Sequence, residues 1–121
     1  MKYMLLIYDD EKTFAKMNQA DLGRMYAEYG QFTQEIKASG NHVSSSQLQP
    51  VANATSVRIR DGKKMLTDGP FAETREQLGG YYLITAKDLD EAIAIAARIP
   101  SARQGTIEVR PIVEMAAPTT A

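Results

Sequence analysis

The sequence predicts one α+β domain with a ferredoxin-like order of elements: β-α-β, an inserted β-hairpin, then β-α-β. Two stretches repeat apolar residues at helical spacing, and several short stretches are apolar or alternate in polarity, as strands do. An Asp61-Gly62 pair between two alternating runs indicates the hairpin. The 121 residues suit a single domain, which we place at residues 1–115 and expect to be followed by a flexible tail at 116–121.

The first strand is predicted at residues 2–8, an apolar run that ends at the turn-forming acids Asp9-Asp10-Glu11. This run is too short to cross a membrane. Acidic residues follow it, whereas a signal peptide has a cleavage site of small residues at this point. We therefore expect a cytoplasmic protein without a signal peptide.

A long helix is predicted at residues 18–39, with Asn18 as its N-cap and Gly40 as its stop. A weaker strand follows from His42 to Leu48, because three serines dilute its apolar character. The apolar stripe of the helix comprises Leu22, Met25, Tyr26, Tyr29, Phe32 and Ile36.

The inserted hairpin is predicted at residues 55–67, and Asp68-Gly69-Pro70 then breaks regular structure. Residues 71–78 are expected to form a turn or a short helix. The pair Gly79-Gly80 leads into a strand at 81–85 and is expected to let two backbones approach closely.

The second helix is predicted to begin after Asp88, which caps it with Glu91 in a capping box, and to end at Pro100. A last strand is predicted at 105–113, where apolar and charged residues alternate.

The two most apolar strands carry apolar residues on both faces, whereas two helices can cover only one face of the sheet. We therefore expect a homodimer in which a second copy covers the other face. The alternative is that the hairpin and the tail fold back over that face. The opposed sets are Tyr3, Leu5 and Ile7 against Met4, Leu6 and Tyr8, and Tyr81 and Leu83 against Tyr82 and Ile84.

The segment Asp68-Gly69-Pro70-Phe71, followed by Ala72-Glu73-Thr74-Arg75-Glu76-Gln77-Leu78-Gly79-Gly80, is unlike a generic loop. It resembles the signature of DGPF-domain proteins within the YCII-related family. The run Lys2 to Tyr8 and the run Ile107 to Ile112 resemble the same family, so the resemblance spans roughly residues 1–115.

The resemblance implies a ferredoxin-like fold and a dimeric α/β barrel. Most DGPF-type members have no assigned reaction, whereas some YCII relatives, including a dehydrochlorinase, use a histidine–aspartate pair in a cleft. That histidine lies on the first helix, and that aspartate precedes a proline after the second helix. Here residues 18–39 contain no histidine and Ile99 precedes Pro100, so the pair is not carried over. DGPF-type genes often lie beside extracytoplasmic-function sigma factors, which implies a regulatory or accessory role as the alternative.

Asp68 is the candidate catalytic residue. A carboxylate between glycine and proline can be held rigidly, and burial would raise its pKa toward the range of a general acid or base. The alternative is structural, because Asp-Gly-Pro turns are common and their aspartate bonds to nearby backbone N–H groups.

The other candidates would bind a small molecule in a cleft beside this segment, with apolar walls. Tyrosine hydroxyls would reach the cleft between helix and sheet, an aromatic ring would stack on the ligand, and polar groups would orient it. The alternatives are core packing for the tyrosines, a core or dimer contact for the aromatic ring of Phe71, and a solvated loop face for the polar groups. The ligand-binding candidates are Tyr8, Tyr29, Asp68, Phe71, Glu73 and Gln77.

Composition excludes several classes of function. The chain has no cysteine and one histidine, His42, so thiolate sites and multi-histidine metal sites are excluded. The net charge of −1 gives no basic field for nucleic acid or anionic lipid. We expect no metal or organic cofactor, and we expect a homodimer that binds neither nucleic acid nor membranes.

Overall fold

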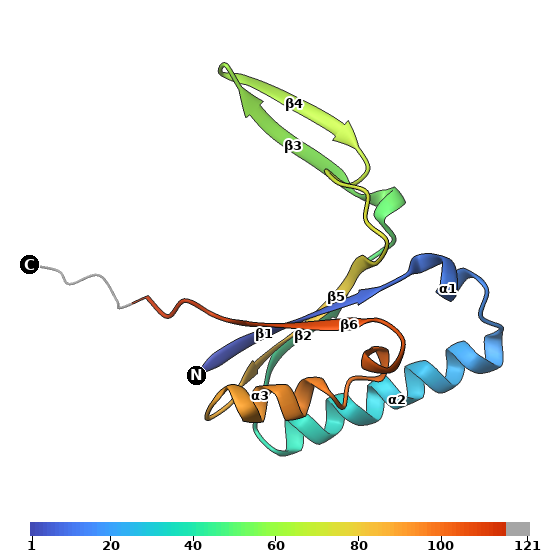
Figure 1. Cartoon of the computed structure of the whole chain (residues 1–121), viewed down its shortest axis with the longest axis vertical. Coiled ribbons are helices and arrows are strands. Elements are labelled where there is room, and N and C mark those ends of the chain that lie inside the picture. The colour runs from blue at the N-terminus through green and yellow to red at the C-terminus, as the bar shows by residue number, and fades with distance from the viewer. Residues whose placement is uncertain (116–121) are drawn as a thin grey trace, which may run out of the picture.

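A four-stranded antiparallel sheet in the order β2-β5-β1-β6 forms the centre of the computed structural model, which describes residues 1–115 (Figure 1). The predicted tail at 116–121 lies outside the described residues. The α+β class, with an inserted hairpin, is confirmed. The four strands are β1 (Lys2–Asp9), β2 (His42–Gln47), β5 (Gln77–Thr85) and β6 (Thr106–Pro111).

The two longer helices, α2 (Gln19–Ala38) and α3 (Leu89–Ala96), lie on the same side of this sheet (Figure 1). Their predicted caps are confirmed. The Asn18 side chain accepts a hydrogen bond from a backbone N–H of the first turn of α2, and Asp88 does the same for α3. Gly40 has a φ of 80°, which ends α2 in the left-handed conformation.

The core lies between the helices and one face of the sheet. Alternate residues of β1 point into it, and this inward row ends at Asp9, which is 6% exposed. Phe32 of α2 meets Tyr82 of β5 edge-on, with their ring centroids 5.1 Å apart. The other core residues include Tyr3, Leu5, Ile7, Ile36, Ile84, Ala92, Ile95 and Ile99.

Three local predictions differ from the structure. The acids after β1 form a short helix, α1 (Glu11–Ala15), because Asp10 caps it by accepting from the Lys12 N–H at 3.0 Å. Residues 71–78, predicted as a turn or a short helix, form no helix: 71–76 are bends and coil, and β5 starts at Gln77, so the two glycines lie inside the strand. The second helix, predicted to end at Pro100, ends at Ala96, and a separate 3₁₀ turn follows at Pro100–Arg103.

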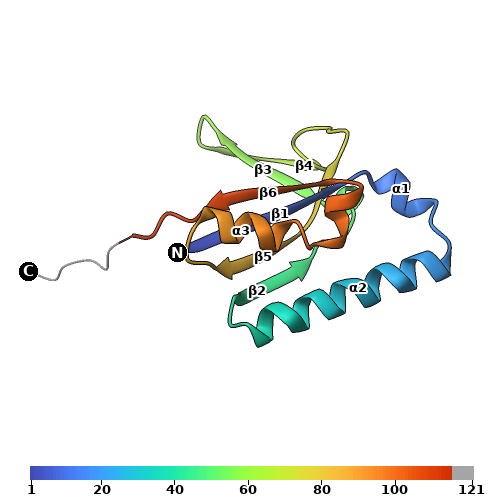
Figure 2. The ribbon, with the colours of Figure 1, turned by 60° about the horizontal axis from the view of Figure 1, so that its bottom comes forward.

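The hairpin of β3 (Thr55–Arg60) and β4 (Lys63–Asp68) is confirmed as a separate two-stranded ribbon. Asp61 and Gly62 have φ values of 52° and 74°, which a type I′ turn requires. The hairpin projects on the opposite side of the main sheet from α2 and α3 (Figures 1 and 2). Four of its apolar side chains are more than half exposed, namely Val57, Ile59, Met65 and Leu66.

Within residues 1–115, no helix is both long enough and apolar enough to cross a membrane.

Candidate functional site

A cavity of about 760 Å³ lies between helices α1 and α2 and strands β1, β2 and β5. This volume is within the range of small-molecule sites. Most of its walls are apolar or aromatic. Residues that line it include Ile7, Phe14, Ala15, Leu22, Met25, Tyr26, Tyr29, Leu48, Pro50, Tyr81 and Tyr82.

Asp9 is the most deeply buried charged group that lines this cavity. It is the last residue of β1, and the alternation of the strand turns its side chain toward the helices. The side chain is only 6% exposed, and its Oδ1 atom is buried without a hydrogen-bond partner. Gly105 lies beside it so closely that a β-carbon there would be 2.5 Å from Oδ1. Buried carboxylate oxygens normally have partners, so an unpartnered one is a functional signal.

The surroundings of Asp9 favour its protonated form. Burial raises the pKa of Asp9 above its usual value, and the nearby Glu76 carboxylate raises it further. The Ser101 hydroxyl and the Gln104 amide lower it in part, although neither gives Oδ1 a hydrogen bond of good geometry. A carboxyl group in this state can exchange a proton closer to neutral pH than an exposed aspartate can.

Two tyrosine hydroxyls complete the polar side of the helix–sheet interface. Tyr29 of α2 shares a hydrogen bond with the fully buried Ser101, and burial raises the pKa of Tyr29 to about 12. Tyr82 of β5 shares a hydrogen bond of 2.7 Å with Thr33 of α2. Both phenols therefore remain neutral and hydrogen-bonded at physiological pH.

Hydrogen bonds fix the elements around the cavity. The Gln77 side chain accepts from the Glu11 N–H at 2.9 Å, which joins the start of β5 to α1. The Glu11 carboxylate accepts from the Val51 N–H at 3.0 Å, which joins α1 to the loop after β2. Gln47 of β2 donates to the Tyr26 hydroxyl of α2 at 3.2 Å. These three hydrogen bonds hold α1, α2, β2, β5 and the loop after β2 in place around the cavity.

Comparison with known proteins identifies the family of this chain. The model of the YCII-related domain matches residues 1–116. The chain belongs to the YCII-related family. It is also 33% identical over 114 residues to an uncharacterised protein of Rhizobium meliloti, and that alignment covers 93% of this chain and 92% of the relative.

This YCII-related domain brings together some of the predicted site residues and separates others. Tyr29 and Gln77 line the cavity. Tyr8 is half-buried and does not line it, since its neighbours in β1 that face the helices are Ile7 and Asp9.

The DGPF segment itself is exposed. Asp68 is the last residue of β4, and neither it, Phe71 nor Glu73 lines the cavity. The Phe71 side chain is 80% exposed. Gly69 has a φ of 96° and donates its N–H to the Ala54 carbonyl at 2.7 Å, so this segment closes the base of the hairpin. A role of these residues in ligand binding stays a prediction.

Asp9 and Ser101 were missed by the sequence predictions. The acids after β1 were interpreted as a turn, but Asp9 is in phase with the buried row Tyr3, Leu5 and Ile7, and this alternation was the available signal. Ser101 gave no such signal, because it is buried by the packing of the 3₁₀ turn against α2, β1 and β6, which are distant in sequence. Ile99, where the resemblance implies an aspartate, is a core residue that is 1% exposed.

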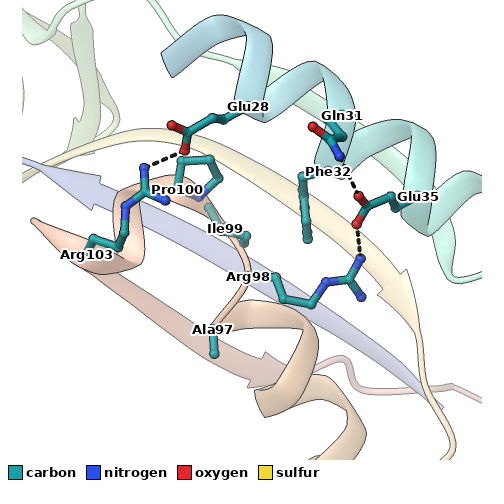
Figure 3. Close-up of a pocket in the computed structure, with 9 residues that line it drawn as sticks. All are labelled: Glu28, Gln31, Phe32, Glu35, Ala97, Arg98, Ile99, Pro100 and Arg103. Atoms are coloured by element: carbon teal, nitrogen blue, oxygen red, sulfur yellow. Dashed lines mark hydrogen bonds and ion pairs between the residues drawn. The ribbon is translucent and has the colours of Figure 1, made fainter. Parts of the chain in front are cut away.

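A second hollow of about 330 Å³ lies where α2 faces the end of α3 (Figure 3). Two ion pairs cross it: Arg98 with Glu35, at 2.7 Å, and Arg103 with Glu28. The Arg98 guanidinium also lies 5.5 Å from the centre of the Phe32 ring. Both arginines are paired, so we assign this hollow a structural role in joining α2 to the chain after α3.

Proposed function

We propose that this YCII-related protein binds a small organic molecule in the cavity between α2 and the sheet, with Asp9 as the polar group that meets it. The observation that carries the proposal is the Asp9 carboxylate, which is 6% exposed, has one oxygen without a hydrogen-bond partner, and lines a cavity with apolar walls. Burying a polar group without a partner is costly, so such a group is retained where a ligand supplies the partner.

Asp9 also fits a role in proton transfer to that molecule. Its raised pKa allows the carboxyl group to hold a proton at a higher pH than an exposed aspartate does, and to exchange it with a bound molecule. The hydrogen bond that Tyr29 shares with Ser101 fixes the Tyr29 hydroxyl beside the cavity, so this hydroxyl would orient a ligand without competing for the proton.

A neutral fluorescent dye, Nile red, tests whether the cavity accepts apolar molecules. We expect the wild-type protein to bind it, and we expect Ala15→Trp, which fills the cavity from the end of α1, to weaken binding by about tenfold or more. Ala20→Trp is the matched control, because Ala20 is an exposed residue of α2 that does not line the cavity. Equal binding by all three proteins would show that the dye binds elsewhere and would contradict the proposal.

We further propose that two copies pair through the sheet face opposite the helices, as a dimeric α/β barrel. The pairs Met4 with Leu83, Leu6 with Tyr81, and Tyr8 with Leu78 form apolar rows on this face. The hairpin projects from the same side and has exposed apolar residues, which a second copy would cover.

Light scattering in solution tests the dimer. We expect twice the chain mass of 13.4 kDa for the wild type. Leu6→Glu should give the chain mass, because it introduces a charge at the centre of the proposed interface. Ile93→Glu, at a half-exposed position of α3, should leave the dimer intact. A wild-type protein with the chain mass at micromolar concentration would overturn this proposal.

A further inference from the structure

We infer that the ligand of the Asp9 cavity is an apolar molecule that carries a protonated amino group, and that organic anions are excluded. This inference rests on the proposed binding site and adds the chemical class of its ligand. It is carried by the charges of the cavity, by the unpartnered Asp9 oxygen and by the aromatic walls.

The charged groups at the polar end of the cavity are all acidic. Asp9 and Glu11 line it, and Glu76 lies close enough to Asp9 to affect its ionisation. Among residues 1–115, no lysine, arginine or histidine lines the cavity. An anionic ligand would therefore meet two carboxylates in the lining, with a third close to Asp9, and no compensating cation, so its binding would be opposed by charge repulsion.

The hydrogen-bonding capacity of these carboxylates differs. Glu11 already accepts from the Val51 N–H at 3.0 Å, and Glu76 accepts from the Thr106 hydroxyl at 2.8 Å. Asp9 Oδ1 has no partner. What is missing at Asp9 is a donor, and an ammonium group supplies up to three N–H donors together with a positive charge.

The remaining lining suits the body of such a molecule. Phe14, Tyr26 and Tyr29 present aromatic rings, and Leu22 and Met25 present aliphatic surface. Aromatic faces attract cations as well as apolar groups, so they favour an amine over an anion of the same shape. A cation at Asp9 would also relieve its repulsion with Glu76.

Three ligands with the same phenylethyl body separate the effects of shape and charge: 2-phenylethylamine, 2-phenylethanol and 3-phenylpropanoate. We expect calorimetric titration at neutral pH to show that the amine binds about tenfold or more tightly than the other two. Asp9→Asn should abolish this preference, because the amide keeps the shape and removes the charge.

Asp10→Asn is the matched control, because it removes a neighbouring negative charge outside the cavity, and asparagine retains the N-cap of α1. It should leave the preference for the amine unchanged. Loss of the preference in both variants would indicate long-range charge instead of contact with Asp9, and would overturn the inference.

The test separates this inference from the proposed function. If the alcohol or the propanoate binds as tightly as the amine and Ala15→Trp blocks it, the cavity is a binding site and only the ligand class is wrong. If none of the three binds and Nile red also fails to bind in the cavity, both the ligand class and the proposed function are wrong.

Discussion

Gly80 of β5 lies where the backbone of β2 passes closest, and replacing it with alanine should destabilise the protein. A β-carbon at this position would be 2.9 Å from the Ser46 carbonyl oxygen and 3.5 Å from the Gln47 Cα. Both neighbours are backbone atoms, so β2 itself would have to shift. We expect a cost of about 1–3 kcal/mol from this overlap, which exceeds the gain of about 0.4–1 kcal/mol from a less flexible unfolded chain.

Gly79 provides the matched control one residue earlier in the same strand. A β-carbon there would meet only the Ile7 carbonyl oxygen, at 4.0 Å, which is an ordinary contact. Gly79→Ala should therefore stabilise the protein by about 0.4–1 kcal/mol. The two variants should differ by about 2 kcal/mol, or on the order of 1 M in the midpoint of urea unfolding followed by circular dichroism.

Both proteins must be compared at one chain concentration, because association would add to the measured stability. A similar loss in both variants would refute the reasoning, since it would mean that any side chain in this part of β5 is harmful. A gain in Gly80→Ala would show that β2 yields without cost.

Two further predictions concern the surroundings of Asp9. Because burial raises the pKa of Asp9, the folded protein binds more protons than the unfolded chain above about pH 4, so its stability should fall as the pH rises through the folded-state pKa. In Asp9→Asn this fall should be smaller, as measured by the free energy of unfolding at pH 4 and pH 8, and an identical fall in both proteins would contradict the prediction. Gly105→Ala should lower the free energy of unfolding by about 2–3 kcal/mol, because its β-carbon would overlap the Tyr8 carbonyl oxygen. Gly23→Ala, on the exposed face of α2, should raise the free energy of unfolding by about 0.5–1 kcal/mol. Equal melting temperatures for the two glycine variants would count against this account.

Most of the fold could be predicted from the sequence because its signals are local. The caps of α2 and α3, the type I′ turn at Asp61-Gly62 and the alternation in β1 each depend on residues within a few positions of one another. The dimer and a sigma-factor link stay predictions, because they concern surfaces between molecules.

The candidate site was harder to predict because it depends on contacts that are distant in sequence. The DGPF segment is distinctive as a sequence, yet Asp68 lies at the base of an exposed hairpin. Tyr29 and Gln77, in contrast, do line the cavity. A sequence motif shows which residues a segment contains, but it does not show which of their side chains face a cavity.

The sequence by itself determined the two longer helices, the strands, the hairpin turn and the apolar character of both sheet faces, because side-chain periodicity and backbone preferences act over one turn or one strand. The tertiary structure alone decided which polar groups are buried. Asp9 is an ordinary acid at the end of a strand until α2, the 3₁₀ turn at Pro100–Arg103 and Gly105 close around it. Its loss of water and of hydrogen-bond partners is a property of that packing, and this property makes Asp9 the centre of the candidate site.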